Sequence, residues 1–302
     1  MATVYDLVTE EILKQLEAGT VPWRKPWNAI TGIPKRLGSE KLEPYRGINV
    51  WLLAHAPYAS PYWITFRGAK RLGGYVKAGE KGRLVVYFGP AKSRKGAEES
   101  EESEERPNYI LRYYKVFNSE QCVFPEALQT RIDACITPAE NTHVPIEACE
   151  AVLEKYLSSV SPPSLGHGGN RACYSPSADS IQMPSKESFE SPAEYYSTLF
   201  HEMAHSTGHR SRLNREELEN PVSFGSHDYS REELTAEFAA AFLCGTAGID
   251  GATIENSAAY IANWSRKLRK EPRWAVTAAN RGQRAAEWIL GVNRTPPKHE
   301  AK

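Results

Sequence analysis

Two histidines and a glutamate lie within five residues of one another, in a pattern typical of metal-dependent hydrolysis. The segment SPAEYYSTLFHEMAHSTGH covers residues 191–209, and within it His201, Glu202 and His205 form the sequence HExxH. On a helix, residues four apart lie one turn apart on the same face, so both imidazoles would point the same way. Two such imidazoles can share one Zn²⁺, and the glutamate between them can take a proton from water activated by the metal. We therefore expect His201 and His205 to be metal ligands and Glu202 to be the general base.

The surrounding residues predict a capped, amphipathic helix, and this context gives the short motif its weight. Ser191 can cap the helix, Pro192 suits its first position, and Glu194 completes a capping box. The apolar residues expected on the buried side are Tyr195, Leu199, Phe200 and Met203.

A catalytic zinc requires a third protein ligand, and a second acid-bearing helix follows. The segment SREELTAEFAAAFLC predicts a helix that begins near Ser230, in which Glu233 and Glu237 share a face. In zinc peptidases with a glutamate ligand, the first acid of such a pair binds the metal, and the second orients a ligand histidine from the outer shell. We assign these roles to Glu233 and Glu237. The alternative stays open, because Ser230 and Glu233 have capping-box spacing, and a Glu233 used in the cap would leave Glu237 as the ligand. Two further histidines are weaker candidates, His209 and His227.

The formal net charge is zero, but the charges are unevenly distributed. Lys+Arg and Asp+Glu both number 37 over the 302 residues. Residues 1–95 hold 16 Lys/Arg and 7 Asp/Glu, which gives a net charge of +9 and leaves −9 for the rest. The run AEESEESEE at 97–105 contributes to this deficit and predicts a solvated loop between two strands. The alternative is that this loop mimics nucleic acid and shields the basic face beside it.

Cations and aromatic residues alternate in the basic region, as in proteins that bind single strands. Aromatic faces stack on bases and cations follow the phosphate backbone, whereas a duplex reader needs a helix for the major groove. No helix-turn-helix signature is present. The candidate single-stranded DNA contacts are Trp23, Arg24, Lys25, Tyr45, Arg46, Arg67, Lys70, Arg71, Lys77, Lys81 and Lys115.

The periodicities predict an α+β protein with two domains. Residues 3–18 fit an amphipathic helix, and the segments RLVVYFG and YILRYYKVFN fit a hairpin that flanks the acidic run. We expect a small α+β domain that binds single-stranded DNA at 1–130 and a linker at 131–144. A mainly helical metallopeptidase-like domain at 145–302 would follow.

Several classes of protein do not fit this sequence. No apolar run approaches the roughly 20 residues of a membrane helix, and the N-terminus lacks the pattern of a signal peptide. The five cysteines are widely spaced and contain no CxxC pair, which favours reduced thiols. We therefore expect a cytoplasmic protein without a membrane partner.

Six segments carry a resemblance to a known family: PYRGIN (44–49), YWITFRGAKRLGGYVKAGEKG (62–82), YYKVFNSEQC (113–122), HGGNRACYSPSADSIQMP (167–184), YYSTLFHEMAHSTGHRSRLNR (195–215) and YSREELTAEFAAAFLC (229–244). In these segments the chain resembles the ArdC-type antirestriction proteins of conjugative plasmids, and its N-terminal half resembles the matching region of TraC-type primases. One departure is Arg67-Gly68-Ala69, where a polar residue of the glutamine type is expected before the alanine. The resemblance implies an N-terminal single-stranded DNA-binding domain, a C-terminal zincin-like metallopeptidase domain, and a role in protecting incoming plasmid DNA from host restriction during conjugation.

Three hypotheses about activity follow from these features. In the first, coating of DNA single strands blocks restriction and the metal site is ancillary. In the second, the chain is a DNA-targeted metalloprotease that cleaves DNA-bound proteins such as the restriction enzyme. In the third, the metal site is structural and the fold is catalytically idle. The ligand set suits Zn²⁺ and also tolerates Mn²⁺.

Overall fold

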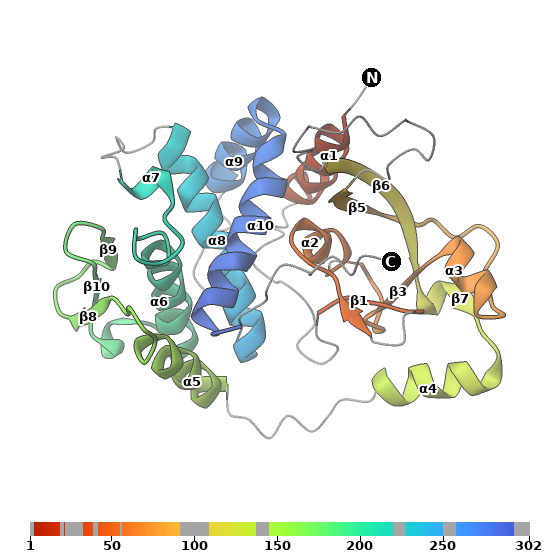
Figure 1. Cartoon of the computed structure of the whole chain (residues 1–302), viewed down its shortest axis with the longest axis horizontal. Helices are drawn as coiled ribbons and strands as arrows, with labels where there is room; N and C mark the ends of the chain where they lie inside the picture. Colours follow the sequence, from red (N-terminus) through yellow and green to blue (C-terminus); the bar gives the residue numbers. More distant parts are fainter. Residues whose placement is uncertain are drawn as a thin grey trace, which may run out of the picture.

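The computed structural model describes residues 3–18, 21, 33–38, 42–54, 56–90, 109–136, 145–219, 227–249 and 258–292. Within these ranges the chain has the predicted α+β organisation with two domains (Figure 1). Trp23, Arg24, Lys25 and the acidic run 97–105, for which the sequence makes predictions, lie outside these ranges. Among the described helices, none has both the length and the apolar character that crossing a membrane would require.

The N-terminal half alternates short helices with the strands of one main sheet. Its elements are α1 (Val4–Glu17), β1 (Lys35–Arg36), β2 (Glu43–Pro44), α2 (Ile48–Ala54), β3 (Tyr62–Thr65), α3 (Phe66–Arg71), β4 (Tyr75–Val76), β5 (Arg83–Pro90), β6 (Tyr109–Asn118), η1 (Ser119–Gln121), β7 (Cys122–Val123) and α4 (Glu126–Ile136).

The main sheet has five strands in the order β2-β1-β3-β6-β5. Strands β1 and β3 are parallel, and the other neighbours are antiparallel. The predicted hairpin is confirmed, because β5 and β6 pair from Arg83 opposite Val116 to Pro90 opposite Tyr109. The Asn49 side chain exchanges two hydrogen bonds with the Val86 backbone, at 2.7 and 2.8 Å, and so covers part of the edge strand β5. A separate two-stranded sheet joins β4 to β7.

The C-terminal half is mainly helical, as predicted. Strands β8, β10 and β9 form a small sheet in that order, with β8 parallel to β10 and β9 antiparallel to it. Its elements are α5 (Pro145–Leu157), β8 (Ser164–His167), β9 (Cys173–Ser175), β10 (Ser180–Met183), η2 (Lys186–Ser188), α6 (Pro192–Ser206), α7 (Glu216–Glu219), α8 (His227–Ala247), α9 (Ala258–Lys270) and α10 (Arg273–Ile289).

One hydrophobic core joins the two halves. Its buried residues come from α1, α2, β5 and β6 on one side and from α5, α6, α8 and α10 on the other. Trp51 of α2 lies at the junction, with its ring 4.9 Å from that of Phe242 and 5.4 Å from that of Phe238 on α8. At the surface of the same junction, Arg46 forms an ion pair of 2.8 Å with Glu287 of α10. The two domains therefore pack against each other through one shared hydrophobic core.

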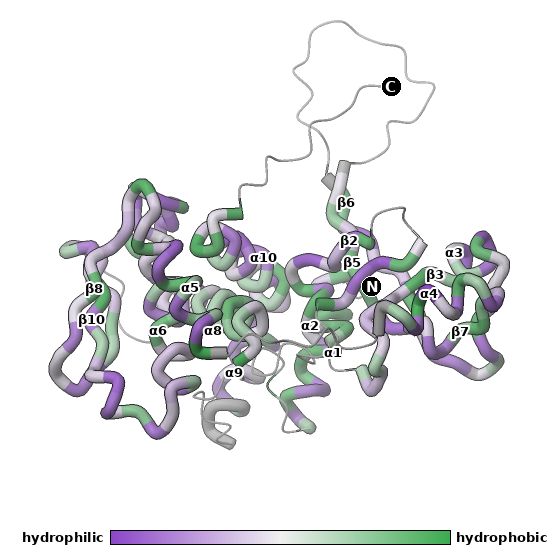
Figure 2. Tube along the Cα trace, turned by 90° about the horizontal axis from the view of Figure 1, so that it is seen from below, coloured by the Kyte–Doolittle hydropathy of each residue, from purple (hydrophilic) through white to green (hydrophobic). Residues whose placement is uncertain are grey.

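A second, smaller core supports the end of the molecule that carries α3, α4, β4 and β7. Its buried members include Ile64, Ala69, Phe124 and Ile132. Because Ile132 belongs to α4, this helix crosses the boundary that the sequence predicts at residue 130. In Figures 1 and 2 this end lies opposite the end formed by β8–β10, α5 and α6.

We expect replacement of Trp51 by alanine to destabilise the whole chain. Trp51 is fully buried, and truncation of a buried aromatic side chain costs about 3–5 kcal/mol. Urea unfolding of the full chain, followed by circular dichroism, should keep a single transition with a lower midpoint. Trp288→Ala is the control, since Trp288 is 41% exposed and its loss should cost no more than about 1 kcal/mol. Two separate transitions, of which only one moves in Trp51→Ala, would contradict a shared core.

Candidate metal centre

Helix α6 forms as the sequence predicts. The Ser191 hydroxyl accepts a hydrogen bond of 3.2 Å from the Glu194 N–H, and Pro192 stands at the first helical position. The predicted capping box is only half formed, because the Glu194 carboxylate accepts from the Glu190 N–H at 2.8 Å. The helix buries its apolar side and presents His201 and His205 from one face.

Helix α8 brings an acidic segment opposite these histidines. It includes His227, so it begins earlier than the predicted start near Ser230. Ser230 therefore lies inside the helix, where it is 2% exposed, and Glu233 stands beyond the first turn. The capping-box arrangement that would have left Glu237 as the ligand is not formed, because its proposed cap residue is not at a helix end.

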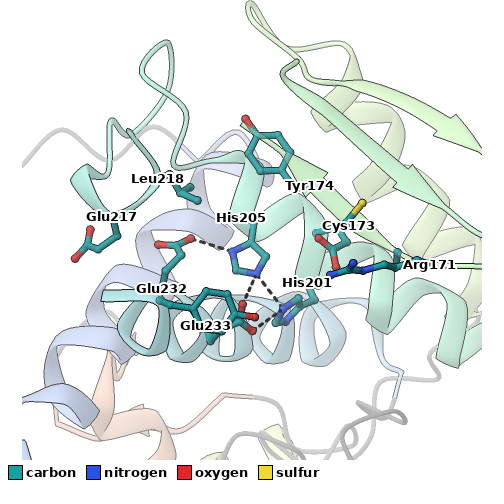
Figure 3. A pocket seen from close by; sticks show the side chains of 12 residues that line it. Arg171, Cys173, Tyr174, His201, His205, Glu217, Leu218, Glu232 and Glu233 are labelled. Carbon is teal, nitrogen blue, oxygen red and sulfur yellow. Dashed lines mark hydrogen bonds and ion pairs between the residues drawn. The ribbon is translucent and has the colours of Figure 1, made fainter. Parts of the chain in front are cut away.

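Three side-chain donor atoms converge between α6 and α8 (Figure 3). The two Nε2 atoms of His201 and His205 are 3.1 Å apart. The Glu233 carboxylate oxygens lie 3.5 Å from His201 Nε2 and 3.6 Å from His205 Nε2. Tetrahedral coordination at the usual zinc distances would place ligand atoms about 3.3 Å apart. The observed spacing therefore fits one metal ion held by these three residues.

The electrostatics of the site favour a cation. Burial lowers the pKa of His201, but the hydrogen bond with Glu233 and the charges of Glu237 and Glu202 outweigh burial and raise that pKa to about 9. Burial raises the pKa of Glu233, but the hydrogen bond from His201 and the charge of His205 outweigh it and lower that pKa to about 2. Negative charge is thus in excess around the two histidines.

The donor atoms open into a pocket of about 280 Å³ between α6, α8 and β9. Glu202 is 9% exposed and lines this pocket beside the histidines. Tyr229 lies one turn before Glu233 on α8, and burial raises its pKa to about 12. Arg171 and Cys173 line the opposite side, from the edge strand of the small sheet and the residues before it. The pocket has room for a substrate group next to Glu202.

Sequence reasoning missed one acid of the site, Glu232. Its Oε1 lies 3.1 Å from His205 Nδ1, and the buried Arg215 holds the same carboxylate. Glu237, to which the sequence assigns the orienting role, is 7% exposed and raises the pKa of His201 by its charge. No spacing rule predicts the different positions of Glu232 and its neighbour Glu233. Their positions depend on contacts with His205 of α6 and with Arg215. Of the two weaker candidates, His209 contacts Ser211 and Asp179 instead of the three donors, and the side chain of His227 lies outside the described residues.

Two of the predicted DNA contacts are less available than the sequence suggests, because Tyr45 is buried and Arg46 is paired with an acid. Tyr45 is only 4% exposed, so its ring belongs to the core and is not available for stacking; this prediction was wrong because burial overrode the local pattern. Arg46 is held by Glu287. Lys77 is exposed and its Nζ donates to the Glu120 carbonyl at 2.8 Å. Lys81 and Lys115 are exposed beside a hollow at the start of β5.

Exposed cations and rings recur along α3, β4 and the residue after β4. We call this set the basic–aromatic patch and define it as Phe66, Arg67, Lys70, Arg71, Tyr75 and Lys77. Phe66 is 59% exposed and Tyr75 is 61% exposed, and sequence reasoning missed both rings as candidate contacts. Among the described residues, no ion pair involves Arg67, Lys70 or Arg71. No acidic residue occurs in the segment FRGAKRLGGYVKAG, residues 66–79.

Comparison with known protein families agrees with this division into two parts. Residues 2–117 match the N-terminal domain of the anti-restriction factor ArdC, and residues 152–281 match a zincin-like metallopeptidase family. An uncharacterized protein of Sinorhizobium fredii, y4eC, is 33% identical over 99% of this chain and 95% of its own length. Two DNA primases TraC of Escherichia coli are also 33% identical over 96% of this chain, which spans 27% and 20% of their lengths.

Solved structures show the same relationship along the whole chain. The Mn(II)-bound crystal structure of the antirestriction protein ArdC from plasmid R388 has a TM-score of 0.71 and 35% identity, covering 96% of this chain and 98% of that one. The metal-free structure of the same protein also has a TM-score of 0.71 and 35% identity, over 97% and 100%. The resemblance that the sequence motifs indicate is confirmed, and the chain belongs to the ArdC family of antirestriction proteins.

Proposed function

We propose that this chain binds single-stranded DNA through the basic–aromatic patch and so protects incoming plasmid DNA from host restriction during conjugation. In the same proposal, its C-terminal half holds a divalent metal ion. The observation that carries the proposal is the separation of the two features. Helix α3, which carries most of the patch, lies at one end of the molecule, and α6, which carries both histidines, lies on the opposite side (Figure 1).

The patch has the chemistry that a single strand requires. Two exposed rings can stack on bases, and the cations around them can neutralise phosphates. Helix α3 has six residues, which is short for an element that reads a major groove. The patch therefore favours a single strand over a duplex.

The metal centre has the ligands of a hydrolytic site. His201, His205 and Glu233 would hold the ion, which suits Zn²⁺ and also Mn²⁺, the ion of the related ArdC structure. A divalent ion there would supply Lewis-acid polarisation of a carbonyl. Glu202 would take a proton from the attacking water and return it to the leaving amine. The Tyr229 hydroxyl hydrogen-bonds to the Glu233 carboxylate and would hold that ligand in place.

The second candidate function is a DNA-targeted metalloprotease that cleaves a DNA-bound protein such as a restriction enzyme. The observation in its favour is the open pocket beside Glu202, since a purely structural metal site would not need one.

The first experiment tests the metal ligands. We expect Glu233→Gln to weaken Mn²⁺ binding more than about 100-fold, beyond the roughly 10–100-fold effect of outer-shell substitutions. Glu237→Gln is the matched control on the same helix and should have the smaller effect. Isothermal titration calorimetry of the full chain measures both. A larger loss in Glu237→Gln would instead make Glu237 the ligand.

The second experiment tests DNA binding on the full chain, because its halves share one core. Replacing Arg67, Lys70 and Arg71 with alanine should reduce the slope of log affinity against log salt for single-stranded DNA by about 2, at about 0.7 per phosphate contact. Phe66→Ala should cost about 1–3 kcal/mol without changing the slope. The control replaces three exposed cations of the C-terminal half, Lys155, Arg210 and Arg284, and should leave the slope unchanged. An equal effect of the two triple variants would refute the patch.

The third experiment separates the two candidate functions. Glu202→Gln should keep the metal and lose the general base. Plasmid transfer is compared between restriction-proficient and restriction-deficient recipients. We expect full protection with Glu202→Gln and loss of protection with the triple patch variant. Loss of protection with Glu202→Gln would instead establish proteolysis as the mechanism.

A further inference from the structure

A buried ion pair lies directly behind the metal centre. The Glu232 carboxylate accepts hydrogen bonds from Arg215 Nε at 2.8 Å and from an Arg215 terminal nitrogen at 2.6 Å. The same carboxylate lies 3.1 Å from Nδ1 of His205. The Glu232 and Arg215 side chains are 5% and 7% exposed, and that of His205 is 11% exposed. All three side chains of this contact are therefore largely shielded from solvent.

Arg215 also fixes the end of the helix that carries the histidines. Its guanidinium donates to the Thr207 hydroxyl at 2.7 Å and to the Ala204 carbonyl at 2.8 Å. The chain between α6 and Arg215 turns back tightly, with the Arg215 N–H bonded to the Gly208 carbonyl at 2.9 Å. A Cβ atom at Gly208 would collide with Leu218 and lie 2.9 Å from the Arg215 guanidinium, so any larger residue there would force one of these side chains to move. The turn therefore fixes the position of Arg215 between the end of α6 and Glu232.

The contact between Glu232 and His205 decides which ring nitrogen faces the other donors. A carboxylate next to Nδ1 stabilises the proton on that nitrogen, which leaves the lone pair of Nε2 free. Nε2 is the atom that lies 3.1 Å from His201 and 3.6 Å from Glu233. Both Glu232 and Glu233 line the same pocket, and both oxygens of Glu232 are taken by Arg215.

We infer that Arg215 and Glu232 form a clamp that positions His205 for metal binding and withholds Glu232 itself from the metal. This inference rests on the proposed metal site and deepens it. Glu232 fixes the tautomer and ring orientation of His205. Arg215 keeps Glu232 in that position, so that Glu233 alone would supply the carboxylate ligand.

The test uses two double variants of the full chain that differ at one position. In both, Arg215→Met removes the buried cation, because a lone buried charge would itself destabilise the fold. Arg215→Met/Glu232→Leu offers His205 Nδ1 no acceptor, whereas Arg215→Met/Glu232→Gln keeps an amide oxygen for it. We expect the leucine variant to bind Mn²⁺ about 10–100-fold more weakly than the unsubstituted chain, and the glutamine variant to recover most of that loss. Chelator competition measures the affinities.

A second measurement needs no substitution and no metal. Long-range ¹H–¹⁵N spectra of the metal-free chain report the tautomer of each histidine. We expect the proton of His205 on Nδ1 in the unsubstituted chain and in the glutamine variant, and a mixture of tautomers in the leucine variant. A proton on Nε2 in the unsubstituted chain would overturn the inference, whatever the variants do.

A control pair at the same end of α6 distinguishes a general loss of packing from loss of the contact with His205. Arg212 is also buried, pairs with Asp179 and donates to the Ser206 carbonyl at 2.7 Å, but it contacts none of the three donors. Arg212→Met/Asp179→Asn should lower the thermal midpoint and leave Mn²⁺ affinity unchanged. Equal affinity losses in the leucine and glutamine variants, or no loss in either, would overturn the clamp. Failure of the unsubstituted chain to bind Mn²⁺ would instead refute the proposed metal site.

Discussion

The close approach of α6, α8 and α10 is the constraint on which the rest of the molecule depends. The seam between them consists of small residues: Ala204 of α6, Ala236 and Ala239 of α8, and Ala285 of α10. Gly282 of α10 continues it, since a Cβ atom there would lie 2.7 Å from Cβ of Phe238 and 2.9 Å from the Thr235 carbonyl. Helices that meet through small side chains bring their backbones close together. The glutamate side chains on α8 can therefore reach the histidines on α6. Larger residues in this seam would move Glu233 away from both imidazoles.

The same helices connect the two halves of the chain. Helix α8 carries Glu232 and Glu233 on the side of the metal centre, and Phe238 and Phe242 on the side of Trp51. The N-terminal helix joins this arrangement as well, because the Thr9 hydroxyl donates to the Pro272 carbonyl at 2.8 Å. Strand β3 extends this packing to the basic–aromatic patch, because it contributes Trp63 to the shared core and Ile64 to the second core under α3 and β4. A strand bound at the patch would therefore keep the pocket at a set distance from the DNA.

Charge is arranged around this common core in two opposite clusters. The exposed segment that contains α3 and β4 has cations and no acid between residues 66 and 79. At the other end, Glu202, Glu232 and Glu233 surround two histidines in a pocket. In the proposed function, the first cluster would attract phosphates and the second would attract a metal cation. The zero net charge of the chain is the sum of +9 in residues 1–95 and −9 in the remaining residues.

Local patterns in the sequence determine a large part of this structure. The HExxH spacing and the Ser191 cap act over a few residues, so helix geometry alone places His201 and His205 together. In the same way, the alternation of residues in β5 and β6 is enough to form the hairpin. Tertiary contacts decide the rest. Glu233 converges with the two histidines because α8 packs on α6, and Glu232 lies behind His205 because Arg215 returns from the following turn. Likewise, Tyr45 is buried while Phe66 and Tyr75 are exposed, since burial depends on which distant segments cover a residue. The sequence alone determines residue types and local spacing, whereas contacts between residues far apart in the chain determine which of them meet.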